Sequence, residues 1–300
     1  MIVGQKESLW LGFGLAAGGT LLFSLKSIFI KLLYQQCLQA DAVLVLRMLI
    51  ALPLYLVILT FSLKKLDGWA ALTKSTLGLT LIAGFLGYYL ASLLDLMGLE
   101  LITAQLERLT LFSYPLLVAL IGVIFLKEKI QMKLVFALIL SYFGLALVMS
   151  QEALLVGSQV GLGVGLVLTS ALAFAIYLSM SKPLIGRLGS VLFTSLAMSI
   201  SSILVFSHGF VTLEWVDLTV TAMAWFWLAL LAIFSTVIPS FMISAAIGRI
   251  GAIQASAVGM LGPVFTIALA IYFLDEPFTL MIAIGALLVL MGVGSLQFKR

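Results

Sequence analysis

The chain is 300 residues long; 63% of its residues are hydrophobic, only 9% are charged, and the mean hydropathy is +1.28. Soluble globular proteins carry roughly 25% charged residues, so this chain cannot cover a water-facing surface and is predicted to be an integral membrane protein. Its net charge of +4 does not indicate nucleic-acid binding, because the basic residues lie mostly in short links between apolar segments. The single Cys37 and the single His208, the latter expected in a loop, exclude a disulfide framework and predict neither a metal site nor a cofactor.

Ten apolar segments are long enough to cross a bilayer. A membrane-spanning helix needs about 20 mostly apolar residues, since the hydrocarbon core is ~30 Å thick and a helix rises ~1.5 Å per residue. The predicted spans are 9–33, 42–63, 76–99, 102–126, 132–151, 160–181, 190–211, 222–247, 252–274 and 278–297. The predicted fold class is therefore an all-α integral membrane protein, and the short links make neighbouring spans antiparallel.

The basic residues predict the orientation of these spans, because cytoplasmic links of membrane proteins are rich in Lys and Arg. With the N-terminus inside, twelve basic residues fall in inner links: Lys6, Lys64, Lys65, Lys74, Lys127, Lys129, Lys133, Lys182, Arg187, Arg249, Lys299 and Arg300. The outer links hold at most Lys31. Both termini are therefore predicted to be cytoplasmic.

The fourth and ninth spans indicate an internal repeat. The fourth contains Ser113-Tyr114-Pro115-Leu116 and ends Phe125-Leu126-Lys127-Glu128-Lys129, and the ninth contains Leu261-Gly262-Pro263-Val264 and ends Phe273-Leu274-Asp275-Glu276-Pro277. The two prolines are 148 residues apart, as are Glu128 and Glu276. Five spans per copy is an odd number, so the second copy must cross the membrane in the opposite sense. We predict two inverted five-helix repeats, residues 1–151 and 152–300, an architecture of secondary transporters that bind substrate at the repeat interface.

These features resemble the EamA-type branch of the drug/metabolite transporter superfamily over essentially the whole chain. Leu22–Lys31 and Leu106–Leu109 also resemble a bacterial subgroup of that branch, whereas Phe23 and Ser24 replace the Trp-Gly pair of the commoner pattern. The resemblance implies transport of a small metabolite, often export, across a bacterial inner membrane. The departure at Phe23 and Ser24 means that substrates assigned elsewhere in the superfamily do not carry over to this chain.

Five ionisable residues lie within the first four spans. They are Lys26, Arg47, Asp95, Glu107 and Arg108. At a rise of ~1.5 Å per residue, all five are predicted to lie at a similar depth in the outer half of the membrane. Charged groups at such depth are costly and mark functional sites by default. The second half has no comparable layer, and the 151-residue offset places Tyr177 opposite Lys26.

Helical spacing predicts which of these side chains face one another. Tyr88 and Asp95 lie on one polar stripe of the third span, and Glu107 shares a face of the fourth span with Tyr114. Arg108 points about 100° away from Glu107, because successive helical residues are separated by that angle. The two residues are therefore expected to reach different partners.

The layer carries three positive and two negative groups, so an anionic substrate would balance its charge. The alternative is a structural ion-pair network that contacts no substrate. Arg47, near the start of its helix, has the further alternative of extending its side chain to the membrane surface. Glu107 and Asp95 are candidates for proton coupling, although the neighbouring cations favour their ionised forms and oppose that role.

Pro115 and Pro263 are hinge candidates, since each removes a backbone hydrogen bond within a span; a fixed packing kink is the alternative.

The sequence predicts a transporter rather than an enzyme: a carrier that exports a small anionic or zwitterionic, amino-acid-like metabolite by alternating access, as a monomer or homodimer among membrane lipids. Lys26 and Arg108 are predicted to bind the anionic group, and Asp95 and Glu107 to orient them. Tyr88, Tyr114 and Tyr177 are predicted to line the cavity. The alternatives are a flippase for an amphiphilic or lipid-linked substrate and a membrane-embedded enzyme.

Overall fold

The computed structural model describes residues 2–65, 72–125, 132–213 and 219–297, and within these ranges the regular secondary structure is entirely helical. Eight helical segments are long and apolar enough to cross a membrane, and Leu261–Leu274 and Leu280–Ser295 are two shorter apolar helices. All ten coincide with the predicted spans. The fold class predicted from the sequence, a ten-helix all-α membrane protein, is therefore confirmed.

The first five spans are formed by single helices and by helices joined end to end. Their bounds are α1 (Ile2–Tyr34), α2 (Ala40–Lys65), α4 (Lys74–Gly84) with η1 (Phe85–Leu90) and α5 (Ala91–Leu101), α6 (Ala104–Leu111) with α7 (Tyr114–Phe125), and α8 (Met132–Val156). The fourth span begins at an N-cap, where the Thr103 hydroxyl accepts a hydrogen bond from the Leu106 amide. It is interrupted at Phe112 and Ser113, and Pro115 then lies in the first turn of α7, where its missing N–H disrupts no helical bond.

The second five spans follow the same plan. Their bounds are α9 (Val160–Leu188), α10 (Ser190–Thr212), α11 (Ala222–Ala232) with η2 (Ile233–Val237) and α12 (Ile238–Gly259), α13 (Leu261–Leu274) and α14 (Leu280–Gln297). Gly251 inside α12 has a φ of 82°, a conformation that favours glycine, so the chain turns there and the ninth span begins. His208 lies within α10, so the expectation that it is in a loop is wrong.

The two halves correspond in their irregularities as well as in their helices. The π-helices η1 and η2 begin 148 residues apart, at Phe85 and Ile233. The interruption at Phe112 and Ser113 corresponds at the same offset to the break between α12 and α13 at Met260. Lys127, Glu128 and Lys129, which also supported the repeat, lie outside the described residues.

The contacts between helices also show the correspondence of the halves, because equivalent helices of the two halves make equivalent contacts. The first span packs on the eighth (α1 on α12) as the sixth packs on the third (α9 on α5), and α1 contacts α13 as α9 contacts α7. The second and seventh spans (α2 and α10) pack on each other, as do the fifth and tenth (α8 and α14). This last pair crosses closely at glycines: a Cβ on Gly144 would lie 2.6 Å from the Gly285 carbonyl oxygen.

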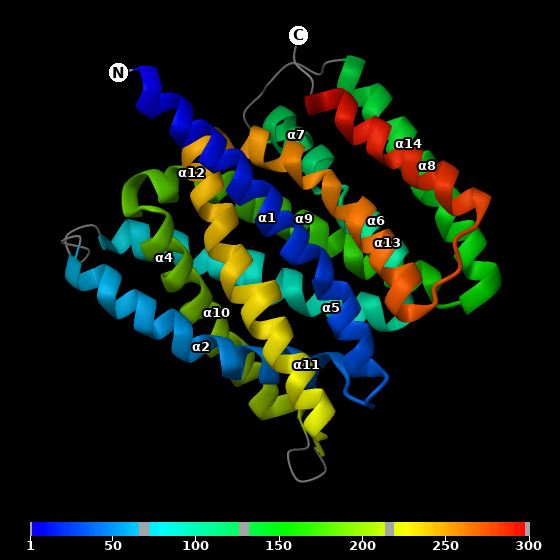
Figure 1. Cartoon of the computed structure of the whole chain (residues 1–300), viewed down its shortest axis with the longest axis horizontal. Coiled ribbons are helices and arrows are strands. Elements are labelled where there is room, and N and C mark those ends of the chain that lie inside the picture. Colours follow the sequence, from blue (N-terminus) through cyan, green and yellow to red (C-terminus); the bar gives the residue numbers. More distant parts are fainter. Residues whose placement is uncertain (1, 66–71, 126–131, 214–218, 298–300) are drawn as a thin grey trace.

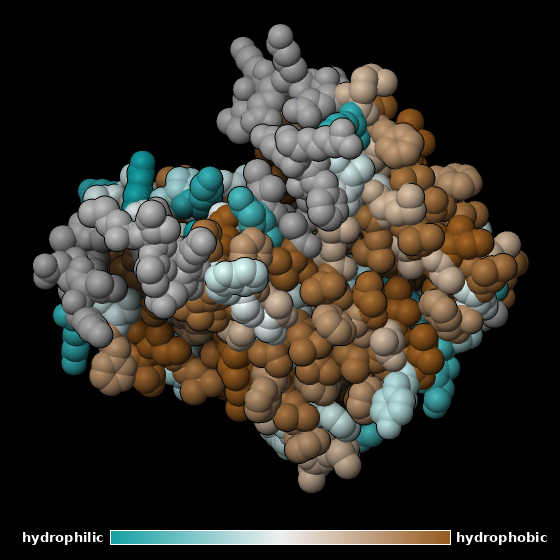
Figure 2. Space-filling view, turned by 45° about the horizontal axis from the view of Figure 1, so that its top comes forward, coloured by the Kyte–Doolittle hydropathy of each residue, from teal (hydrophilic) through white to brown (hydrophobic). Residues whose placement is uncertain are grey.

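The surface matches a protein surrounded by lipid. Apolar side chains cover most of the central part of the face in Figure 2, and hydrophilic side chains gather mainly towards its edges. In Figure 1, α1 begins and α14 ends on the same side of the helical bundle, as an even number of spans requires. The helices between them enclose the buried polar residues that form the candidate site.

Candidate functional site

A cavity lies between the two halves, lined by α1, α2, the third and fourth spans, and by α9, α10, η2, α12 and α13. Its volume is about 160 Å³. One buried water needs only ~10–15 Å³, so a small metabolite fits. Both π-helices border it, through Tyr88 of η1 and Ser235 and Thr236 of η2. Such π-helical turns occur frequently at functional sites.

The five predicted ionisable residues all lie inside the protein, and none faces lipid. Their side chains belong to buried residues with exposed fractions of 9% for Lys26, 2% for Arg47, 1% for Asp95, 0% for Glu107 and 9% for Arg108. Four of them line the cavity; Glu107 does not, because it is directed towards α1. The predicted layer is therefore an internal one on the cavity wall.

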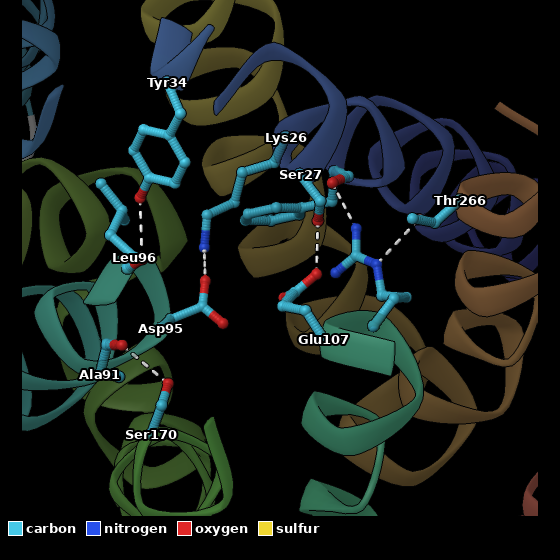
Figure 3. Close-up of polar contacts among 11 residues, drawn as sticks. Lys26, Ser27, Tyr34, Ala91, Asp95, Leu96, Glu107, Ser170 and Thr266 are labelled. Atoms are coloured by element: carbon cyan, nitrogen blue, oxygen red, sulfur yellow. Dashed lines mark hydrogen bonds and ion pairs between the residues drawn. The ribbon is translucent and has the colours of Figure 1, made fainter. Parts of the chain in front are cut away.

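Lys26 on α1 and Asp95 on α5 form an ion pair in which the Lys26 ammonium donates to Asp95 Oδ2 (Figure 3). The other carboxylate oxygen of Asp95, Oδ1, is buried and has no hydrogen-bond partner among the described residues. The pair joins the first and third spans at the cavity wall. It leaves Asp95 with capacity to accept one further bond.

Glu107 and Arg108 reach different partners, as their helical spacing predicted. Glu107 Oε2 accepts a hydrogen bond from the Ser27 hydroxyl at 2.6 Å (Figure 3). Arg108 donates through Nε to Thr266 Oγ1 at 3.0 Å and through Nη2 to the Phe23 carbonyl oxygen. Arg108 therefore connects the fourth span with the first and the ninth, and so links the two halves.

Ser27 and Thr266 were not singled out from the sequence. The signal for Ser27 was available, since it is adjacent to a lysine within a span. Thr266 had no such signal because its role depends on α13 packing against α1, where its hydroxyl also donates to the Ser24 carbonyl oxygen at 3.2 Å. From the sequence alone, a threonine hydroxyl that bonds a neighbouring helix cannot be distinguished from one that bonds a backbone carbonyl of its own helix.

Arg47 does not extend to the membrane surface, so the alternative considered for this side chain from the sequence does not hold. It is 2% exposed and lines the cavity beside Met48. Its Nε and Nη2 atoms are buried and have no hydrogen-bond partner in the part of the chain that the structure describes. The physical reason is the packing of α2 against α10, α11 and α5, which encloses this side chain seven residues into the helix.

The three predicted tyrosines form a chain of contacts at the apolar side of the cavity. Tyr88 and Tyr114 line it, whereas Tyr177 lies behind Tyr88 and shares a hydrogen bond of 2.7 Å between the two hydroxyls. Gly87 permits this contact, because a Cβ there would lie 2.3 Å from the Tyr177 ring. Tyr114 packs edge-on against Phe174, with ring centroids 5.3 Å apart. Of the hinge candidates, Pro263 lines the cavity and Pro115 does not.

Two carboxylates from other spans bind the start of the fourth span. Glu276, in the link between α13 and α14, accepts hydrogen bonds from the amides of Ala104 at 2.7 Å and Gln105 at 3.1 Å. Glu152 at the end of α8 accepts from the Thr103 amide at 2.5 Å and its hydroxyl at 2.6 Å. The amides at a helix N-terminus attract negative charge. Burial raises the pKa of Glu276 above its ordinary value, although these hydrogen bonds oppose the rise.

The contacts of Glu276 explain the motif Phe-Leu-Asp-Glu-Pro that was recognised in the sequence. The α13 helix ends at Leu274, and Asp275 adopts the left-handed conformation with a φ of 52°. The resulting turn directs Glu276 back towards the first half of the chain, and the Pro277 carbonyl accepts a bond from the Gln105 side chain at 3.3 Å. The conspicuous acid of the ninth span therefore acts on the fourth.

Comparisons with known proteins agree with this architecture. The model of the EamA-like transporter family matches residues 10–150 and again residues 161–296. An uncharacterized transporter, YcbK, of Bacillus subtilis (strain 168) is 30% identical over 287 residues, which cover 94% of this chain and 91% of the relative. A second from the same organism, YetK, is 24% identical over 261 residues, covering 85% and 77%. A solved crystal structure shares the fold, with a TM-score of 0.67 and 14% identity over 97% of this chain and 96% of that chain.

Proposed function

The chain belongs to the EamA-like transporter family, and from that premise we propose that it exports a small anionic or zwitterionic, amino-acid-like metabolite by alternating access. The observation that carries this proposal is the cavity between the halves, which is lined both by buried ionic groups and by aromatic rings. Charged groups buried within spans indicate a substrate or ion pathway. The proposed location is a bacterial inner membrane, with both termini in the cytoplasm.

The roles within the site follow from position. Lys26 and Arg108 present positive charge to the anionic group, while Asp95 holds Lys26 in place or accepts a bond from an amine. Glu107 lies outside the cavity lining and binds Ser27 of the first span. Tyr88 and Tyr114 contact the rest of the substrate, and Tyr177 supports Tyr88 from behind. The alternative remains a structural network, and the transport assay below separates the two.

Alternating access is supported by the correspondence between the halves and by the carboxylate contacts at one end. In the proposed orientation, Glu276 and Glu152 lie at the outer end and join the fourth span to the ninth and the fifth. The cavity extends towards the other end as far as Ile247 and Ala255, close to the turn at Gly251. These contacts support a carrier whose outer end is held together while the cavity extends towards the inner end.

Pro115 and Pro263 are proposed hinges in this motion. Each follows an interruption of its span, at Phe112 and Ser113 in one half and at Met260 in the other. A helix interrupted at equivalent points in two inverted halves can bend at one point while its counterpart straightens, which is how such repeats exchange conformations. Hinge residues absorb backbone rotation without taking part in binding.

The test is solute counterflow in reconstituted vesicles. Vesicles loaded with an unlabelled metabolite should accumulate the labelled form when the protein is present, and a proton ionophore should change the rate if protons are coupled. Lys26→Ala should abolish the counterflow while the folded yield, measured by size-exclusion chromatography, is retained. Chemical alteration of the metabolite would instead identify an enzyme, transbilayer movement of a labelled lipid would identify a flippase, and normal transport by Lys26→Ala would refute the role of Lys26.

A further inference from the structure

Arg47 differs from the other buried cations of the cavity in having no partner for one edge of its guanidinium group. Lys26 is paired with Asp95, and Arg108 is bound by a hydroxyl and a carbonyl oxygen. Arg47 Nε and Nη2 lie next to each other on the guanidinium plane and are both buried without a partner among the described residues. Two adjacent N–H donors of this kind fit the two oxygens of a carboxylate.

The net charge of the buried ionisable residues also points to Arg47. The buried ionisable residues around the cavity are Lys26, Arg47, Arg108, Asp95 and Glu107, which carry one more positive charge than negative when all are ionised. Asp95 is already matched by Lys26, whereas Glu107 and Arg108 are each bonded by neutral groups, the Ser27 hydroxyl for Glu107 and the Thr266 hydroxyl for Arg108. Among the described residues, the buried cation whose donors still lack an acceptor is Arg47. A buried charge without a counter-ion is unfavourable, so a ligand carrying one negative charge would be bound strongly here.

The remainder of the cavity wall defines the rest of the ligand. Phe23, Phe112, Tyr114 and Phe174 contribute aromatic rings, and Met48 lies beside Arg47 itself. Tyr114 packs edge-on against both Phe112 and Phe174, with ring centroids 5.9 and 5.3 Å apart. Fixed aromatic surfaces of this kind bind apolar groups, and methionine adapts to their shape.

We propose that Arg47 is the anion-binding residue of this cavity and that the ligand is an apolar monocarboxylate with no second charged group. This inference rests on the proposed transport function and narrows its substrate from an anion or zwitterion to a monoanion. Asp95 Oδ1 is also unpartnered, but a zwitterion that used it would add no net charge and would leave the positive surplus in place. A monoanion removes the surplus.

The experiment compares ligands that share a skeleton and differ in charge. Purified full-length protein is titrated with 4-methylpentanoate, L-leucine and 4-methylpentanamide, and in parallel with 3-phenylpropanoate, L-phenylalanine and 3-phenylpropanamide. Binding is measured as the rise in melting temperature, since a ligand of the native state stabilises it. The carboxylates should bind at least tenfold more tightly than the matching amino acids and amides.

Three variants make the assignment specific. Arg47→Met should lose carboxylate binding while its melting temperature without ligand stays equal to or above that of the wild type, because an unpaired buried charge has been removed. Arg47→Lys keeps the charge without the two-donor edge and should bind the carboxylates at least tenfold more weakly. Arg187→Met, which removes an exposed arginine near the end of α9, should bind them normally.

The inference is overturned if the amides or amino acids bind as tightly as the carboxylates, if Arg47→Met retains binding, or if neither carboxylate binds. A lower melting temperature of unliganded Arg47→Met would assign Arg47 a structural role instead. Counterflow with a wider metabolite panel is scored separately. Transport of another class of metabolite would therefore leave the proposed function intact while this inference fails.

Discussion

The ion pair between Lys26 and Asp95 allows a structural role to be separated from a substrate-binding role. The perturbation is a pair of variants. Lys26→Met removes the charge while keeping most of the side-chain volume, and Lys26→Met/Asp95→Asn removes both charges. The single variant leaves the Asp95 carboxylate buried beside the cavity without its cation. The double variant leaves two neutral groups and, unlike the single variant, does not alter the net charge of the layer.

The expected magnitudes follow from burial. Removing one partner of a fully buried ion pair destabilises a protein by about 3–5 kcal/mol. Lys26 is 9% exposed and both residues line the cavity, where water can hydrate the remaining carboxylate. We therefore expect about 3 kcal/mol for the single variant, or about a 100-fold change in the folded-to-unfolded ratio. The double variant should recover most of this loss, because no uncompensated charge remains.

The assay combines thermal unfolding in detergent, followed by tryptophan fluorescence, with counterflow in vesicles. If Lys26 binds substrate, the double variant should be nearly as stable as the wild type yet transport at least tenfold more slowly. If the pair only fixes the first span against the third, the double variant should recover both stability and transport. A single variant as stable as the wild type would refute the reasoning itself, since it would mean that the pair contributes nothing to the fold.

Three further predictions concern parts of the fold outside that pair. Ser27→Ala removes the hydroxyl that bonds Glu107 at 2.6 Å and should destabilise the protein by about 1–3 kcal/mol, measured by thermal unfolding; an unchanged melting temperature would contradict this. Gly144→Ala places a methyl group 2.6 Å from a backbone oxygen of α14 and should cost about 1–3 kcal/mol, whereas Gly165→Ala, with nothing within 4 Å, should not destabilise. Because burial raises the pKa of Glu276, the folded protein binds that proton more tightly than the unfolded chain does. Stability should therefore fall as the pH rises from the ordinary pKa of glutamate towards the raised one, and Glu276→Gln should flatten this part of the pH profile.

Much of the fold was predictable because each signal was local. A bilayer fixes the length of a span, and ten apolar segments therefore located ten helices within nine residues of their observed bounds. The divergence of Glu107 and Arg108 was also predictable, since it depends only on the angle between successive helical residues. The break at Gly251 was anticipated as the boundary between the eighth and ninth spans.

The partners of those residues were less predictable, because they depend on which helices pack together. The position of Arg47 near the start of a helix left open whether its side chain joined the charged layer or reached the surface, and the helices packed on α2 enclose it. The acid Glu276 was expected at a helix end, and nothing in its own span indicated that it would bind amides of α6. Ala104 and Glu276 are 172 positions apart, so their contact can be predicted only when the packing of the helices is known. The internal repeat does not specify that packing.

In the proposed mechanism, the asymmetry of the charged layer is consistent with the symmetry of the scaffold, because the two would serve different steps of transport. Exchange between inward- and outward-open forms would need two halves with equivalent backbones, and the matched π-helices and interruptions are such equivalences. Substrate recognition needs a single set of charges, and duplicating Lys26, Arg47 and Arg108 in the second half would bury more uncompensated charge. The second half instead contributes neutral acceptors and hydroxyls, as when Thr266 binds Arg108 and the Gly262 carbonyl accepts from the Ser24 hydroxyl at 3.2 Å. These neutral contacts can break and re-form as the halves move without leaving an unpaired ion on the second half, so one ionic site can serve both conformations.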